Sequence, residues 1–275
     1  MNIDLKIDAE NISKEIVDGT IEQACFDYEN ILGNYHFLTS SNIEKSFLNN
    51  LGNNLAKHTR KNPRNYLAFC TKIWHNNIKD GRTPLGNILA VLESIDPDTV
   101  IPEILNMCRS AKNADDVDTL VNGFEPVILR DPEKYLPLLH KEIRSDSTWV
   151  QRLVIVTIGH IMYRYKTEVI TSQCLEVMRP VIINGNKKVS KATSWIIGSY
   201  GVRADQRAVA EFMSSFAGSD NENVVWTFAE AFKRSKIALQ ADIIEGLIPI
   251  FEEWSNSDHP KIKKCAKSAL KILVK

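Results

Sequence analysis

The sequence predicts an all-α protein, an α-solenoid of stacked antiparallel helix pairs. Apolar residues recur at helical spacing, a plan of helix, polar turn and helix repeats at a nearly constant interval, and no segment shows the apolar alternation with hairpin turns that indicates β-strands. The 44% hydrophobic content is enough for a substantial core. Because no long Gly/Ser-rich linker divides the chain, we expect one domain over residues 1–275, built from about six or seven helix pairs.

The repeat is clearest in the second half of the chain. Four segments share an apolar helix, a short polar turn and a second apolar helix that opens on a β-branched residue. The equivalent β-branched residues follow one another at steps of 39, 36 and 37 residues, and they are Val150, Val189, Val225 and Ile262. This interval is close to the roughly 40-residue period of HEAT-type repeats.

Each repeat makes physical sense as a helix hairpin. Asp131 is placed to cap a helix that has Pro132 at its first position and a buried apolar face. The partner helix over 148–163 is apolar on most sides, as a helix packed between neighbours is. One hairpin cannot bury such faces alone, so the hairpins are expected to stack.

The same plan extends toward the N-terminus. Residues 96–129 are expected to form a hairpin that opens at Asp96 and has its second helix from Val117 to Leu129. An earlier pair of helices is expected over 63–73 and 84–95. Repeats then occupy residues 63–275, and residues 1–50 form N-terminal capping helices.

Composition excludes several classes of protein. The N-terminus lacks the apolar stretch of a signal peptide, and no apolar run approaches the roughly 18 residues of a membrane span, so we expect a cytoplasmic protein with no membrane partner. The 5 cysteines and 6 histidines are dispersed without metal-ligand spacing, so no metal is expected and the cysteines are interpreted as reduced core residues. Common nucleotide-binding and hydrolase motifs are absent from the sequence, no cofactor is indicated, and a monomer is expected.

The formal net charge of zero hides an asymmetry. Residues 1–140 hold 14 Lys and Arg against 20 Asp and Glu, whereas residues 141–275 hold 20 against 14. A polyanion would prefer the second half. The alternative is that the two halves of the chain differ by chance. The asymmetry can therefore be interpreted only when the charges are located on a fold.

One helical position carries a cation in three of the four repeats. Arg152 and Lys191 follow Val150 and Val189 by two places, and Lys264 follows Ile262 by two. Second helices of HEAT arrays line a concave surface, so these cations would form a stripe that a phosphate backbone could follow. Six further cations would thicken it: Lys187, Lys188, Arg203, Lys233, Arg234 and Lys263. The alternative is that each is a solvated helix residue.

Two further residues are candidates for a site. Trp195 lies one helical turn after Lys191, which places its ring on the face of that cation, although the core is the commonest place for a tryptophan. Asp118 precedes Arg152 by one repeat. An acid near a helix N-terminus is ordinarily a dipole or capping device, but Asp115 and Asp116 can fill that role.

At these residues the sequence resembles the AlkD family of alkylpurine DNA glycosylases, HEAT-like solenoids that cradle duplex DNA in a basic concave groove. The resemblance covers roughly residues 63–213. Three segments carry it, in the family's order and spacing: Asp115-Asp116-Val117-Asp118, Ser145-Asp146-Ser147-Thr148-Trp149-Val150-Gln151-Arg152, and Lys191-Ala192-Thr193-Ser194-Trp195-Ile196 with Tyr200 following.

The resemblance implies a role for each of three residues. Asp118 would be the catalytic carboxylate, Arg152 would grip the DNA backbone near the lesion, and Trp195 would pack against the lesioned nucleotide. The implied reaction is hydrolysis of the N-glycosidic bond of cationic N3- or N7-alkylpurines in double-stranded DNA, without metal or organic cofactor. A carboxylate suits this chemistry because it stabilises an oxocarbenium-like sugar and orients water.

Two departures from the family pattern leave an alternative open. The family has a second tryptophan just before Asp-x-Val-Asp, where this chain has Ala114. The family's N-terminal tyrosine has only Tyr28 and Tyr35 as candidates. The alternative function is therefore a non-catalytic HEAT-like scaffold that binds structured DNA or a protein partner.

Overall fold

The computed structural model describes residues 4–39, 43–76, 78, 80–235 and 237–274, and every regular element in those ranges is a helix. The predicted all-α class is thus confirmed. The elements are α1 Leu5–Asp18, α2 Ile21–Thr39, α3 Lys45–Ala56, η1 Thr59–Lys61, α4 Pro63–Asn76, α5 Leu85–Ile95, α6 Pro97–Arg109, α7 Ala114–Phe124, α8 Pro132–Glu142, α9 Thr148–Tyr165, α10 Glu168–Asn184, α11 Lys187–Ile196, the π-helical turn η2 Ile197–Gly201, α12 Val202–Ala204, α13 Gln206–Ser214, α14 Glu222–Arg234, α15 Ala241–Ser255 and α16 Pro260–Leu273.

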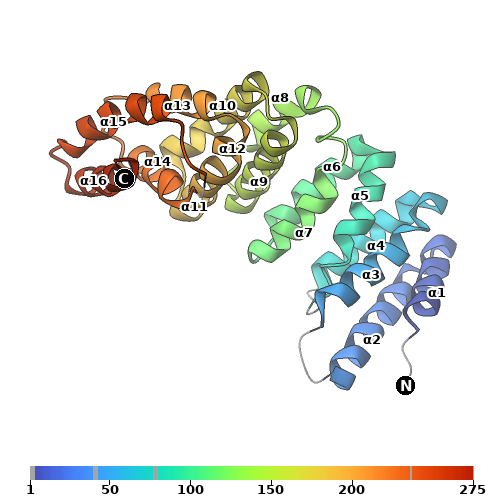
Figure 1. The fold of residues 1–275 in the computed structure, drawn as a ribbon. Coiled ribbons are helices and arrows are strands. Elements are labelled where there is room, and N and C mark those ends of the chain that lie inside the picture. Colours follow the sequence, from blue (N-terminus) through green and yellow to red (C-terminus); the bar gives the residue numbers. More distant parts are fainter. Residues whose placement is uncertain (1–3, 40–42, 77, 79, 236, 275) are drawn as a thin grey trace. The chain divides into compact units, whose positions relative to one another are not determined.

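The helices divide into two compact units, unit 1 over Met1–Arg130 and unit 2 over Asp131–Lys275. Unit 1 has two layers: α2, α4 and α6 follow one another in one, and α1, α3, α5 and α7 follow one another in the other (Figure 1). Helix α3 therefore belongs to the repeats rather than only to a cap. The single domain over 1–275 stays a prediction.

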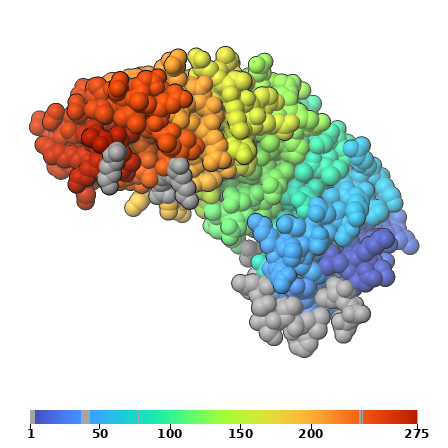
Figure 2. Space-filling view, viewed as in Figure 1, coloured from blue at the N-terminus to red at the C-terminus, as the bar shows by residue number. Residues whose placement is uncertain are grey.

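Unit 2 has the same two-layer plan. Helices α8, α10, α13 and α15 form its first layer, and α9, α11, α14 and α16 form its second. In the space-filling view, successive helices within each unit form a continuous packed surface (Figure 2). No helix in the described part of the chain is long and apolar enough to cross a membrane.

The repeat read from the sequence corresponds to the second layer of unit 2. The four equivalent β-branched residues lie in the first turn or so of α9, α11, α14 and α16, and all are buried. Three of these helices begin with a side-chain cap, from Ser147, Asn186 and Asn221. Asn223 also links neighbouring repeats, because its amide donates to Ile182 O at 2.8 Å and its carbonyl accepts from Ser190 Oγ at 2.7 Å.

Helix boundaries follow the predicted capping residues in most places. Asp96 and Asp131 accept backbone N–H bonds at the starts of α6 and α8, as expected. Helix α7 differs, because it begins at Ala114 rather than Val117 and ends at Phe124 rather than Leu129. Asn113 caps it earlier, by accepting from Asp116 N at 2.9 Å. Pro126 has no N–H to continue the hydrogen-bond ladder of α7, which explains the early end.

The five cysteines are free and sit in or near the core, as interpreted from the sequence. Four of them are buried and Cys265 is half-buried. Burial raises the pKa of the Cys108 and Cys174 thiols to about 12. These thiols are therefore protonated core groups with little nucleophilic character.

Candidate functional site

The candidate catalytic acid, Asp118, lies on the exposed side of α7. Val117, Leu120 and Val121 of the same helix are buried, so the helical spacing turns Asp118 and Asp115 toward solvent. Both carboxylates are exposed and lie one turn apart. An accessible carboxylate at this place is what the sequence-based assignment of Asp118 requires.

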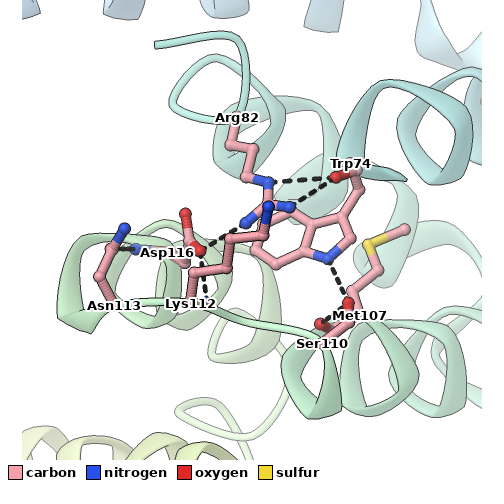
Figure 3. A network of polar contacts seen from close by, with 7 residues as sticks. All are labelled: Trp74, Arg82, Met107, Ser110, Lys112, Asn113 and Asp116. Carbon is pink, nitrogen blue, oxygen red and sulfur yellow. Dashed lines mark hydrogen bonds and ion pairs between the residues drawn. The ribbon is translucent and has the colours of Figure 1, made fainter. Parts of the chain in front are cut away.

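Asp116, between them, has a different role. Its carboxylate accepts from Arg82 Nη1 at 2.5 Å and from Lys112 N at 2.8 Å, and the two charged side chains are only 10% and 12% exposed. Figure 3 shows this network at the start of α7. A buried ion pair with additional hydrogen bonds fixes geometry, because its charges cannot be satisfied elsewhere. Asp116 thus anchors the turn of α7 that precedes Asp118.

The same network contains an indole. The guanidinium of Arg82 lies 4.3 Å from the centroid of the Trp74 ring and donates to Trp74 O at 2.9 and 3.1 Å. Trp74 Nε1 donates to Ser110 Oγ at 2.9 Å, and its side chain is fully buried. Trp74 therefore cannot replace the tryptophan that the resemblance expects at Ala114, since it has no surface for DNA to contact.

A pocket of about 410 Å³ opens beside this network. It lies wholly in unit 1, and its lining combines the 78–83 connection with the start of α7: Ile78, Asp80, Arg82, Thr83, Lys112, Asn113, Asp115, Asp116 and Thr119. Asp118 is not part of the lining. The pocket is therefore separate from the carboxylate to which the sequence assigns catalysis.

The two tyrosine candidates of unit 1 differ. Tyr28 is fully buried and donates from its hydroxyl to Gly81 O at 2.6 Å, so it anchors the connection before α5 and has no surface for a ligand. Tyr35 is half-buried, with its ring centroid 4.0 Å from that of Phe47. Only Tyr35 keeps a surface of the kind that the family role requires.

In unit 2, Arg152 and Trp195 lie on the neighbouring second-layer helices α9 and α11. Arg152 is half-buried in the second turn of α9. Trp195 is 42% exposed, which excludes the core location that was the alternative for it. Its ring lies edge-on to Tyr200, with centroids 5.2 Å apart.

The predicted basic position is exposed in two of its three repeats. Lys191 and Lys264 are exposed, whereas Arg152 is half-buried, and the equivalent residue of α14, Thr227, is fully buried. The stripe is therefore interrupted at α14. Asp118 lies in unit 1 and the cations lie in unit 2, so a single site made of Asp118, Arg152 and Trp195 stays a prediction.

The additional cations have varied surroundings. Lys187, Lys188, Lys263 and Arg203 are exposed, and the ammonium of Lys188 lies 5.3 Å from the centroid of the Trp149 ring. Lys233 is partly neutralised, because its Nζ donates to Glu230 Oε1 at 2.8 Å. The side chain of Arg234 lies outside the described residues.

The starts of α11 and α16 carry cations where a helix favours anions. Lys187 and Lys188 occupy the first turn of α11, Lys261 and Lys263 occupy that of α16, and neither turn contains an acid. Lys261 Nζ is paired with the Glu222 carboxylate at 3.1 Å. The partial positive charge of a helix N-terminus makes this placement unfavourable in the isolated protein. A bound anion such as a phosphate would relieve the repulsion. In the described ranges, no group of three His, Cys, Asp or Glu side chains is arranged to hold a metal ion.

Curated proteins and solved structures do not identify the family of this chain. No curated protein matches the chain. Among solved structures it is similar to an engineered protein at 12% identity, with 100% of this chain and 97% of that chain covered and a TM-score of 0.35. It is also similar, at 12% identity and a TM-score of 0.19, to a computationally designed self-assembling cyclic homooligomer, with coverage of 98% and 93%.

The family comparison covers most of the repeats. A model of the family described as DNA alkylation repair enzymes matches residues 47–235, which is more than half of the chain and includes Asp118, Arg152 and Trp195. This match agrees with the resemblance in the sequence and supports a general role in alkylation repair. The chain belongs to the family of DNA alkylation repair enzymes.

Proposed function

We propose that the protein binds double-stranded DNA through the cations of unit 2 and hydrolyses the N-glycosidic bond of cationic N3- and N7-alkylpurines. The observation that carries the proposal is the exposure of the Trp195 indole, because a buried ring could not contact a nucleotide. An indole face favours a cationic group by about 0.5 to 2 kcal/mol. It would therefore prefer an alkylated purine over a normal one.

Asp118 would supply the chemistry. Alkylation gives the purine a positive charge and makes it a good leaving group, so the enzyme needs only to stabilise positive charge on the sugar and to orient water. An exposed carboxylate on a helix that is anchored by the Arg82–Asp116 ion pair meets both needs. Arg152 would hold a phosphate near the lesion.

The test is release of free base from duplex DNA that contains N7-methylguanine or N3-methyladenine. We expect Asp118→Asn to lower the single-turnover rate by about 100-fold or more, the usual contribution of such a group. Asp115→Asn, one turn earlier and equally exposed, is the matched control and should change the rate only a few-fold. Equal rates for wild type and Asp118→Asn would remove Asp118 from catalysis.

DNA binding is measured in parallel. Arg152→Ala should weaken binding of the same duplex, whereas Arg207→Ala should not, because Arg207 lies on first-layer helix α13, within 3.7 Å of Asp242. Loss of binding in both variants would indicate a diffuse charge effect rather than a grip by Arg152.

The second candidate is a DNA-binding scaffold without catalysis. The observation that favours it is Ala114 at the position of the family's second tryptophan, together with the complete burial of Trp74. It predicts that wild type binds duplex DNA and releases no base. Release that appears in Ala114→Trp would show that the missing ring is the reason.

A further inference from the structure

Tyr200 is the centre of a ring cluster of which the proposed function uses only Trp195. It lies in the π-helical turn Ile197–Gly201, and its ring is edge-on to three others in α9 and α11. The centroid separations are 5.2 Å to Trp195, 5.6 Å to Tyr163 and 5.6 Å to His160. Single π-turns within helices occur frequently at functional sites.

Local packing fixes this cluster. A Cβ on Gly198 would lie 2.1 Å from Ala231 O, so only glycine lets the π-turn approach α14 this closely. On the other side, Gly159 of α9 leaves the space into which the Tyr200 ring fits, because a Cβ there would lie 2.9 Å from Tyr200 Cδ2. The π-turn is therefore held close to the backbone of α14, and the Tyr200 ring packs where Gly159 has no side chain.

Two rings of the cluster face solvent. Tyr163 is 44% exposed and Trp195 is 42% exposed, while Tyr200 between them is half-buried. Single exposed apolar residues are ordinary, but rings gathered around a common neighbour are the type of surface that partners use. The exposed ring of Tyr163 has no role in the proposed chemistry.

Two cations accompany the Tyr163 ring. Lys166 Nζ lies 5.0 Å and Arg203 Cζ 5.9 Å from its centroid, and both side chains are exposed. Lys166 is the left-handed residue that ends α9, with φ 51, and its N–H donates to Met162 O, so the backbone beside the ring is fixed. An exposed aromatic ring close to two exposed cations complements a ligand that is both flat and anionic.

We propose that Tyr163, Lys166 and Arg203 form a binding site for an unpaired nucleotide, with the base on the tyrosine ring and its phosphate between the two cations. Aromatic rings interleaved with cations are the general means of holding single-stranded nucleic acid. Paired duplex offers its phosphates but keeps its bases stacked on one another. The proposal rests on the proposed function only in taking DNA as the ligand, and it adds a preference for DNA with an unstacked base.

The experiment compares three DNA ligands by fluorescence anisotropy at one salt concentration: a paired duplex, the same duplex with one unpaired 2-aminopurine, and the single strand that carries it. We expect wild type to bind the second duplex about tenfold more tightly than the first, the usual effect of one stacked base. Stacking should also quench the 2-aminopurine fluorescence.

Substitutions of Tyr163 test whether its ring causes the preference and the quenching. Tyr163→Leu should lose the preference and the quenching while keeping its affinity for paired duplex, and Tyr163→Phe should keep both. Phe26→Leu is the matched control, because Phe26 is a 58% exposed ring in unit 1, and it should behave as wild type.

Three outcomes would overturn the proposal, and each can be recognised. If wild type binds both duplexes equally, or if Tyr163→Leu keeps the preference, the nucleotide site is wrong and duplex binding stands. If wild type binds no DNA, both proposals fail. Self-association that is lost in Tyr163→Leu, without any DNA preference, would instead assign the rings to an interface between copies. Base release from paired methylated duplex that persists in Tyr163→Leu separates this site from the proposed chemistry.

Discussion

Unit 1 is acidic and unit 2 is basic, and they also differ in where their notable charges lie. Residues 1–130 hold 13 Lys and Arg against 18 Asp and Glu, whereas residues 131–275 hold 21 against 16. In unit 1 a guanidinium and a carboxylate are buried against an indole at the start of α7. In unit 2 the cations at the starts of α11 and α16 are exposed.

The same repeat plan is therefore expected to serve different purposes in the two units. Buried charge in unit 1 fixes the helix that carries Asp118, since a paired charge inside a protein tolerates little movement. Exposed charge in unit 2 contributes little to stability and remains available to an external anion. Unit 1 is thus expected to respond to mutation mainly in stability, and unit 2 mainly in binding.

The largest effect is expected for Arg82→Met in unit 1. It leaves the Asp116 carboxylate buried without its partner, so we expect the free energy of unfolding of unit 1 to fall by about 3 to 5 kcal/mol. Hydrogen exchange of unit 1 peptides in a urea titration measures it. Lys72→Met is the control, because its pair with the exposed Glu22 should be worth less than about 1 kcal/mol. A similar small loss for Arg82→Met would mean that the buried pair does not hold unit 1 together.

The stability of unit 1 is also expected to depend on pH, through the buried carboxyl of Glu93. Burial raises the pKa of the Glu93 carboxyl to about 7, against the Val127 N–H and Arg130, which lower it. The folded state therefore holds this proton more tightly than the unfolded chain does, because the pKa of the same carboxyl is near 4.5 in the unfolded chain. Stability from this group is fully present below about pH 4.5 and is lost as the pH rises through about 7, with a total effect of up to about 3 kcal/mol.

Glu93→Gln isolates this group. The amide cannot ionise but keeps an oxygen to accept from Val127 N, so the difference in unfolding free energy between wild type and variant should change with pH over that window. Chemical denaturation at pH 5, 6, 7 and 8 gives the difference, and contributions of other groups cancel in it. A difference that does not vary with pH would show that Glu93 is ionised in the folded protein.

Most of the fold could be predicted from residues that are close together in the sequence. Helical periodicity, caps such as Asp96 and Asp131, and the repeat interval depend on residues near in sequence, and the structure confirms them. The end of α7 was missed, although Pro126 signals it. The exposure of Trp195 agrees with its assigned role. The absence of a cation at Thr227 could be seen in the sequence, whereas the burial of that side chain and the partial burial of Arg152 depend on packing between repeats.

The site contacts were harder to predict because their partners are distant in sequence. Arg82 and Asp116 are 34 residues apart, and neither lies in a sequence motif that indicates the other as its partner. Tyr200 follows Tyr163 by 37 residues, which is one repeat. That interval was the available signal, since residues one period apart on successive second-layer helices become neighbours.

In unit 2, Gly198→Ala is expected to lower stability, unlike substitutions of the exposed cations. Its Cβ would meet Ala231 O at 2.1 Å, and a backbone atom cannot swing away as a flexible side chain can, so we expect a loss of about 1 to 3 kcal/mol and a displaced π-turn. Gly246→Ala, in α15 with nothing within 4 Å, is the control and should stabilise by about 0.5 to 1 kcal/mol. Thermal unfolding compares them, and equal effects would mean that the π-turn is not held by this contact.

The smallest effect tests whether binding charge belongs to unit 2 at all. Lys191→Gln removes an exposed cation at the repeated position, so the slope of log affinity for duplex DNA against log salt should become less steep by about 0.9. Lys14→Gln removes an equally exposed cation from α1 in unit 1 and should leave the slope unchanged. The folded stability of both variants should match wild type within about 0.5 kcal/mol, which separates binding from unfolding. If both substitutions reduce the slope equally, DNA follows the cations of both units, and the division between an anchoring unit and a binding unit is wrong.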